Sequence, residues 1–229
     1  MFDADCLKLM FVAGSQDFYH IKGGKNDRIN ALLDTLELAL QSQITAFQFR
    51  QKGDLALQDP TQIKRLALEC QKLCKKYGAP FIINDEARLA LELKADGVHV
   101  GQEDMAIEEV VTLCKKRLFI GLSVNTLEQA LKARHLDSVA YLGVGPIFPT
   151  LSKKDAKEVV GVELLKKIQD SGVKKPLIAI GGITTDNASK LQKFSGIAVI
   201  SAITQAKDKA LAIETLLKKM NIFLPYRVQ

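Results

Sequence analysis

The sequence predicts an α/β protein, a single-domain (β/α)8 barrel of the TIM-barrel class over residues 1–229. Eight short apolar runs alternate with segments of helical character along the chain. Strands that alternate with helices indicate a parallel sheet. A length of 229 residues suits one barrel, and no linker or low-complexity segment divides it. These observations favour a closed barrel over an open, doubly wound sheet.

The predicted strands are apolar runs that stop abruptly at polar or glycine residues. The first, LKLMFVA, ends at Gly14, and the second, ITAFQF, ends at Arg50. Short continuous apolar runs are typical of strands buried on both faces, as in a parallel barrel. The eight predicted strands are residues 7–13, 44–49, 81–83, 98–100, 118–122, 139–144, 177–180 and 197–200.

The segments between the strands carry helical spacing and helix-end signals. Pro60 stands in the first turn of one helix and Gly78 follows its last turn, the positions that these residues favour. Thr126 is a predicted N-cap, with Gln129 three residues later in the pattern of a capping box. The predicted helices are residues 28–41, 60–77, a short segment after Asp85, 105–116, 126–134, 162–171, 186–194 and 207–220.

The composition argues against a membrane-spanning, secreted or disulfide-bonded protein. No apolar run approaches the ~20 residues of a membrane span, and the amino terminus has two acids and no basic segment of a signal peptide. We therefore expect a cytoplasmic protein with no membrane partner. The four cysteines form no CxxC pattern, so we expect buried, reduced thiols.

The net charge of +6 raises nucleic-acid binding as one interpretation. The basic residues, however, gather at predicted helix ends, where cations oppose the helix dipole. They form no stripe with interleaved aromatic residues, and the chain has no Trp. We therefore expect no nucleic-acid partner. The sequence leaves the oligomeric state open, with a homo-oligomer as one expectation.

Polar and charged side chains follow most of the predicted strands. In a (β/α)8 barrel the active site lies at the carboxyl ends of the strands, so these residues should meet on one face. They are Arg50, Lys52, Asn84, Asp85, Asp104, Ser123, Thr150, Ser152, Lys153, Gly181, Gly182 and Ser201. The lysines at helix ends should lie on the opposite face.

Asp85 and Asp104 follow two consecutive strands. If those strands lie side by side, both carboxylates enter the same space. One or two carboxylates with phosphate oxygens and water form a typical Mg²⁺ site. The alternative is that each Asp only caps the helix that follows. Two such residues in neighbouring units favour the metal site.

The remaining residues of the set suit phosphate groups. Arg50, Lys52 and Lys153 supply hydrogen-bond donors, and with the carboxylate pair they suit a pyrophosphate. The Gly181-Gly182 turn, with Ser201, lies where barrels often bind a monophosphate. No strong general base stands at a strand end, since His99 lies within a predicted strand. Such a site favours ionising a leaving group over abstracting a proton.

Six sequence blocks together resemble the thiamine-phosphate synthase family, in the order that the family has them. The blocks are QFRQK (48–52), IND (83–85), DGVHVGQED (96–104), GVGPIFPT (143–150), AIGGIT (179–184) and ISAI (200–203). They span nearly the whole chain, and together they are highly specific.

The resemblance implies a transferase of thiamine biosynthesis. It would join 4-amino-2-methyl-5-(diphosphooxymethyl)pyrimidine to 4-methyl-5-(2-phosphooxyethyl)thiazole, or its carboxylated form, and release pyrophosphate. The implied chemistry is dissociative: pyrophosphate leaves, a pyrimidine carbocation forms, and the thiazole nitrogen captures it. One Mg²⁺ per subunit is implied, with phosphorylated small molecules as the substrates.

The resemblance also implies roles for individual residues. Asp85 and Asp104 would bind the metal, and Arg50, Ser123 and Lys153 would be catalytic. The residues implied for the pyrimidine pyrophosphate are Gln48, Phe49, Arg50, Gln51, Lys52, Asn84, Ser123 and Lys153. Those implied for the thiazole phosphate are Thr150, Leu151, Ser152, Gly181, Gly182, Ile200 and Ser201.

Two positions depart from the family pattern: Gln51 stands for a usual Glu, and Ser152 for a usual Thr that also has a hydroxyl. Two alternatives remain at this point. A thiazole tautomerase shares the barrel but would need a histidine for proton transfer. A non-catalytic regulator on the same barrel would be expected to have lost a metal carboxylate.

Overall fold

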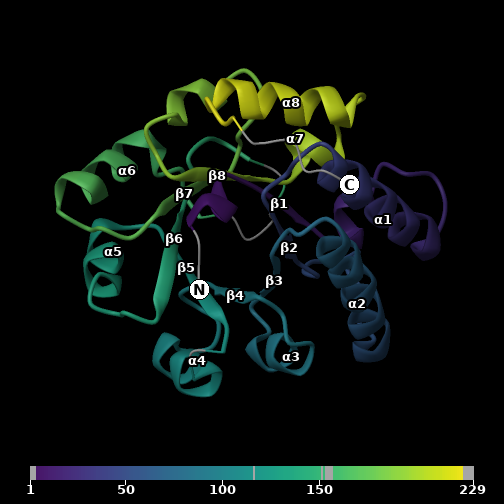
Figure 1. Ribbon diagram of the computed structural model, residues 1–229, viewed down its shortest axis with the longest axis horizontal. Coiled ribbons are helices and arrows are strands. Elements are labelled where there is room, and N and C mark those ends of the chain that lie inside the picture. The colour runs from purple at the N-terminus through teal and green to yellow at the C-terminus, as the bar shows by residue number, and fades with distance from the viewer. Residues whose placement is uncertain (1–3, 116, 151, 153–156, 224–229) are drawn as a thin grey trace.

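The computed structural model describes residues 4–115, 117–150, 152 and 157–223. Its centre is a closed barrel of parallel strands in the order β1 to β8 (Figure 1). The prediction of a (β/α)8 barrel is therefore confirmed. The strands are β1 (Leu9–Ala13), β2 (Ala46–Phe49), β3 (Phe81–Asn84), β4 (Gly97–Val100), β5 (Phe119–Val124), β6 (Val139–Val144), β7 (Leu177–Ile180) and β8 (Gly196–Val199).

Helices surround the outside of the barrel (Figure 1). The α-helices are α1 (Lys25–Gln41), α2 (Pro60–Lys76), α3 (Ala87–Glu92), α4 (Ile107–Cys114), α5 (Leu127–Ala133), α6 (Gly161–Asp170), α7 (Ser201–Thr204) and α8 (Lys209–Lys219). Three short 3-10 helices are η1 (Ala4–Leu7), η2 (Ser15–Phe18) and η3 (Ala188–Leu191).

One predicted helix is wrong. Residues 186–194 form only the 3-10 helix η3. The Asn187 side chain accepts a hydrogen bond from the amide of Thr184 and donates one to the carbonyl of Gly182, both at 2.9 Å. Such local bonds offer the backbone an alternative to helical pairing. They also tie the connection to the glycine turn that follows β7.

Side chains alternate between the barrel interior and the surrounding helices. On β2, Phe47 and Phe49 belong to the large cluster beneath the helices. Gln48, between them, points into the barrel and is 3% exposed. The inner apolar cluster is made of Leu7, Met10, Val12, Ala46, Ile82, Tyr141, Ile178, Ala198 and Ile200. The interior is thus a packed floor beneath the carboxyl ends of the strands.

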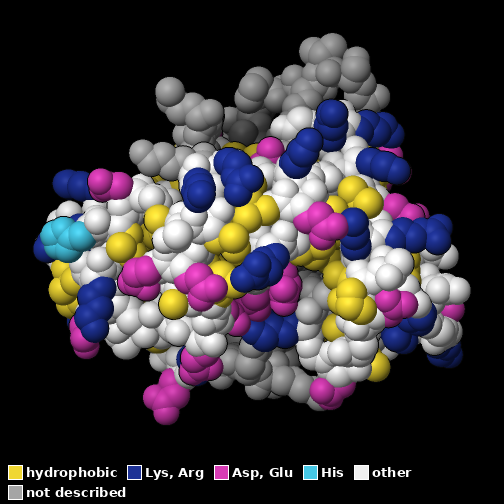
Figure 2. All heavy atoms as spheres, turned by 90° about the horizontal axis from the view of Figure 1, so that it is seen from below, with side chains coloured by type: hydrophobic (Ala, Val, Ile, Leu, Met, Phe, Trp, Pro, Cys, Tyr) yellow, Lys and Arg dark blue, Asp and Glu magenta, His cyan; other side chains and the backbone are white. Residues whose placement is uncertain are grey.

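The structure tests the predicted positions of the basic residues and the predicted state of the thiols. Basic residues occupy the last turns of α2, α5, α6 and α8. On the face drawn in Figure 2, Lys and Arg are interspersed with Asp and Glu. All four cysteines are free, and three of them are buried as predicted; the prediction of burial is wrong for Cys6, which is partly exposed. Across the described residues, no helix combines the length and the apolar character that a membrane crossing needs.

The start of α5 confirms the predicted capping box. The amide of Gln129 donates to Thr126 Oγ1 at 3.2 Å. The Gln129 side chain in turn accepts from the amide of Thr126 at 3.3 Å, which completes the box, and from the amide of Asn125 at 2.7 Å. Asn125 donates from its side chain to the carbonyl of Gly145, so this cap holds the loop after β5 against the loop after β6.

We predict that Thr126→Ala lowers the free energy of unfolding by about 1 kcal/mol, because a capping hydroxyl is lost. Thr126→Ser keeps the hydroxyl and should stay close to the wild type. Urea unfolding followed by circular dichroism measures both variants. Equal stability of the Ala and Ser variants would show that the cap does not stabilise α5.

Candidate active site

A pocket opens where the carboxyl ends of the strands meet, and most of the predicted site residues line it. Those that do are Gln48, Arg50, Lys52, Asn84, Asp85, Asp104, Ser123, Thr150, Ser152, Gly181, Gly182, Ile200 and Ser201. The barrel therefore collects residues that are up to about 150 positions apart in the sequence into one cavity, as expected for this fold.

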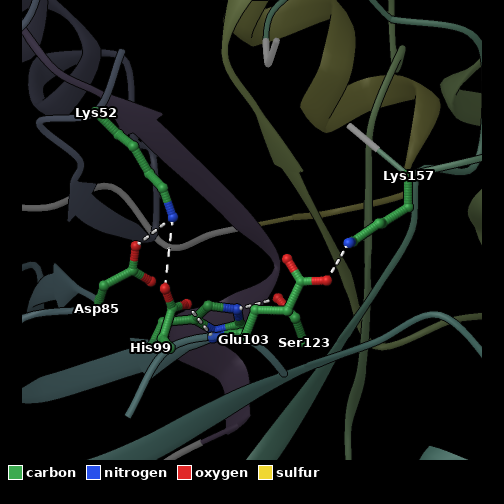
Figure 3. A network of polar contacts seen from close by, with 8 residues as sticks. Lys52, Asp85, His99, Glu103, Ser123 and Lys157 are labelled. Carbon is green, nitrogen blue, oxygen red and sulfur yellow. Dashed lines mark hydrogen bonds and ion pairs between the residues drawn. The ribbon is translucent and has the colours of Figure 1, made fainter. Parts of the chain in front are cut away.

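At one end of the pocket, Lys52 lies between two carboxylates (Figure 3). Its Nζ is 2.9 Å from Asp85 Oδ2 and 3.5 Å from Asp104 Oδ1. The Asp85 and Asp104 side chains are only 20% and 23% exposed. Two half-buried carboxylates that share one cation form a site that also suits a divalent metal ion.

The backbone sets both carboxylates in place. Asn84 pairs with His99 across β3 and β4, and the amide of Asp85 donates to the carbonyl of His99 at 2.8 Å. Asp85 has a φ of 65°, a left-handed conformation that Asp tolerates. Asp104 accepts a hydrogen bond from the amide of Gly101 at 2.8 Å. The loops after two neighbouring strands thus aim both side chains at one point.

The alternative that these residues only cap helices is wrong. The N-cap of α3 is Glu86 and that of α4 is Ala106. Neither Asp85 nor Asp104 is the cap residue of the helix that follows it. Both side chains instead meet Lys52, a contact that a capping role does not explain.

The two carboxyl groups influence each other's pKa. Burial and the neighbouring Asp104 raise the pKa of Asp85 to about 6, while Lys52 acts in the opposite direction. Burial also raises the pKa of Asp104, but hydrogen bonds from Asp85, the Gly101 amide and Lys52 outweigh it, so that this pKa is lowered. Asp104 is therefore the more readily ionised of the two.

Among the described residues, two acids meet at this end of the pocket and could bind a metal ion. Within the part of the chain that the structure describes, no cluster of three or more His, Cys, Asp or Glu residues could hold a metal ion. A site with two carboxylates fits Mg²⁺, which keeps several waters and commonly takes further ligands from substrate phosphates.

The other end of the pocket is built from hydroxyl groups and a glycine turn. Ser152 Oγ lies 3.0 Å from Ser201 Oγ, at the start of α7. Thr150 Oγ1 accepts a hydrogen bond from the amide of Ser152 at 3.2 Å. Gly181 and Gly182 have φ values of 99° and 63°. A Cβ atom at Gly182 would lie 2.3 Å from the carbonyl oxygen of Pro149, so this close approach requires glycine.

Two residues implied by the resemblance lie elsewhere. Phe49 packs beneath the helices and is 2% exposed. Gln51 accepts a hydrogen bond from the amide of Leu57 at 3.0 Å and contacts Ser15, which closes the loop after β2. Neither lines the pocket. Leu151 and Lys153 lie outside the described residues.

The pocket also has lining residues that sequence reasoning did not assign. His99 and Tyr141 form part of its floor, and Glu103 and Lys157 form an ion pair at its edge (Figure 3). Inward alternation along β4 and β6 is a signal that could have found His99 and Tyr141. Nothing in the spacing indicates that Lys157 reaches Glu103, because loop conformation decides that contact.

We predict that Lys52→Met raises the pKa of Asp85 above about 6 in the metal-free protein, because the ammonium group lowers it. The carboxyl group would then lose its proton at a higher pH than in the wild type. Carbon-13 NMR of the Asp carboxyl groups measures this titration. Lys64→Met, which removes a surface pair with Glu92, is the control. A lower or unchanged pKa in Lys52→Met would contradict the assigned contact.

The comparisons with known proteins agree on one family. A family model described as thiamine monophosphate synthase matches residues 18–203. The chain is 91% identical over 218 residues to a thiamine-phosphate synthase of Helicobacter pylori strain J99, covering 95% of this chain and 99% of that protein. It is 50% identical over 213 residues to the enzyme of the same name from Pasteurella multocida, covering 92% and 95%.

The fold gives the same result. A solved thiamine phosphate pyrophosphorylase from Pyrococcus furiosus is 35% identical, with a TM-score of 0.79 over 95% of this chain and 97% of that chain. The resemblance drawn from the six sequence blocks is thus confirmed. On the evidence of its sequence, its barrel and these relatives, the chain belongs to the thiamine-phosphate synthase family of enzymes.

Proposed function

We propose that this protein joins the pyrimidine pyrophosphate to the thiazole phosphate and releases pyrophosphate and thiamine phosphate. The observation that carries the proposal is a single pocket with two ends of unlike chemistry. Lys52, Asp85 and Asp104 stand at one end. Ser152, Ser201 and the glycine turn stand at the other. A pocket with two such ends suits two phosphorylated substrates held side by side.

The residues at the first end would act on the leaving group. When bound, Mg²⁺ would supply positive charge that polarises the pyrophosphate. Asp85 and Asp104 would hold the ion. Arg50, which is 5% exposed, and Lys52 would donate hydrogen bonds to pyrophosphate oxygens. Their contribution grows as charge develops on the leaving group, so that they favour the transition state over the ground state.

Lys52 would change partners during this process. In the described structure its ammonium group bridges the two carboxylates. A divalent ion would neutralise those carboxylates and free Lys52 to bind the substrate anion. Lys153, which lies outside the described residues, is proposed for the same group because it matches the family motif.

The second end would hold the other substrate. Backbone amides of Gly181 and Gly182 and the hydroxyl groups of Ser152 and Ser201 would bind the thiazole phosphate. Thr150 and Leu151 are proposed to contact the same substrate. Fixing both reactants in one orientation converts a bimolecular step into an effectively unimolecular one. The dissociative path suits this pocket, because the departure of pyrophosphate from the pyrimidine requires no general base.

The direct test is to mix both substrates with the protein and Mg²⁺ and to measure thiamine phosphate and pyrophosphate by liquid chromatography and mass spectrometry. The two products should form in equal amounts, and only with Mg²⁺. Thiazole isomerisation without pyrophosphate release would favour the tautomerase. Tight binding of either substrate with no turnover would favour the regulator.

We predict that Asp104→Asn lowers kcat roughly 100-fold or more, the scale of losing a charge-stabilising group at an active site. The fold should remain intact, because Asp104 stands in the loop after β4 and its side chain is partly exposed. Steady-state pyrophosphate release measures the rate. Glu128→Gln, which alters only a surface pair with Lys132, is the control. A near-normal rate in Asp104→Asn would remove Asp104 from the proposed metal site.

A further inference from the structure

Three polar side chains form a continuous row across the floor of the pocket. The hydroxyl group of Tyr141 on β6 lies 2.9 Å from His99 Nδ1 on β4. His99 Nε2 lies 2.8 Å from Ser123 Oγ on β5 (Figure 3). The family resemblance implies that Ser123 contacts the pyrimidine pyrophosphate, whereas it implies no role for His99 or Tyr141. The row connects the buried floor of the barrel to the reacting end of the pocket.

The barrel makes room for this row with two glycines. A Cβ atom at Gly121 would lie 2.2 Å from Tyr141 Cζ and 2.4 Å from His99 Nδ1. A Cβ atom at Gly143 would lie 2.9 Å from His99 Cε1. Any other residue at Gly121 would displace one of the rings. The tight fit also restricts rotation of the imidazole, so its two nitrogens keep their separate partners.

The chemistry of the three groups allows two directions of hydrogen bonding. A neutral imidazole has one N–H donor and one nitrogen acceptor. In the first direction Tyr141 donates to Nδ1, and Nε2 donates to Ser123 Oγ. The hydrogen of the Ser123 hydroxyl group can then point into the pocket. In the reverse direction Ser123 donates to Nε2 and offers the pocket only lone pairs.

The chemistry of the two hydroxyl groups that flank His99 favours the first direction, because a phenol is the stronger hydrogen-bond donor and an aliphatic alcohol the better acceptor. Burial raises the pKa of Tyr141 well above its usual range, so that the phenol keeps its hydrogen. A hydrogen bond with Gln48 acts in the opposite sense, which is the effect of an amide that donates to the phenol oxygen. This bond leaves the phenol hydrogen of Tyr141 available to His99 Nδ1, which lies 2.9 Å away.

We propose that Tyr141 and His99 are positioning residues, which hold the Ser123 hydroxyl group as a hydrogen-bond donor toward the anionic leaving group. The identity of that anion rests on the proposed function, whereas the direction of the row does not. An acceptor at Ser123 would repel pyrophosphate oxygens, so the row selects for an anion at this position. The proposal gives Tyr141 an effect on the reaction although its hydroxyl group is buried beneath His99.

The first test measures the direction without any substrate. Nitrogen-15 NMR of the histidine ring distinguishes the Nε2–H from the Nδ1–H tautomer. We expect His99 to populate the Nε2–H tautomer alone in the wild type and a mixture in Tyr141→Phe. Tyr77→Phe, at a surface hydroxyl group that contacts Glu37, should leave the His99 signals unchanged. An Nδ1–H tautomer in the wild type would overturn the proposal, and this measurement needs no variant to fold.

The second test asks whether Tyr141 acts through Ser123. We expect Tyr141→Phe to lower kcat roughly 10-fold, the scale of one hydrogen bond, with little change in KM for the pyrimidine substrate. In a Ser123→Ala background the same change should have almost no further effect, because residues that act as a unit are not additive. If each substitution lowered kcat by the same factor with or without the other, Tyr141 would not act through Ser123 and the proposal would be overturned.

The two tests also separate this inference from the proposed function. If the wild type forms no thiamine phosphate, the proposed reaction fails while the tautomer of His99 still decides the direction of the row. If turnover is normal but His99 carries its hydrogen on Nδ1, the reaction stands and the positioning role fails.

Discussion

The structure depends on holding two carboxylates close together at the ends of adjacent parallel strands. Asp85 and Asp104 would repel each other if both were ionised and alone, and partial burial increases that cost. Lys52 offsets it by placing one ammonium group between them. The pKa of Asp85 nevertheless stays raised, first by burial and second by Asp104. Lys52 therefore offsets the repulsion between the carboxylates only in part. A divalent cation between the two carboxylates would relieve this repulsion.

The barrel supplies what this arrangement requires. Closure of β1 to β8 brings the loop after β2 against those after β3 and β4, so that Lys52 can reach both acids. The same closure gathers the hydroxyl groups of Ser152 and Ser201 and the glycine turn at the other end of the pocket. On the proposed function, these unlike ends would give the two substrates different places. Beneath both, the row of Tyr141, His99 and Ser123 replaces apolar packing with directed hydrogen bonds.

Much of this follows from sequence because periodicity and strand ends are local. The alternation of strands and helices predicted the barrel, and the positions after each strand predicted the carboxylate pair. The helix expected at 186–194 failed because Asn187 bonds to nearby backbone instead. Phe49 belongs to a contiguous motif, but the strand turns its side chain away from the pocket. Inward alternation could point His99 and Tyr141 into the barrel, but their contact could not be predicted, since it depends on glycines of β5 and β6 that only the fold brings against the His99 ring.

The central claim is that Asp85 and Asp104 hold a metal ion against pyrophosphate. Anomalous X-ray diffraction from crystals grown with Mn²⁺ and pyrophosphate tests it most directly. We expect one Mn²⁺ peak at about 2.1 Å from oxygens of both carboxylates, with pyrophosphate oxygens completing its shell and Lys52 turned toward the anion. Pyrophosphate bound with no metal peak between the two carboxylates, or with Lys52 still bridging them, would contradict the account.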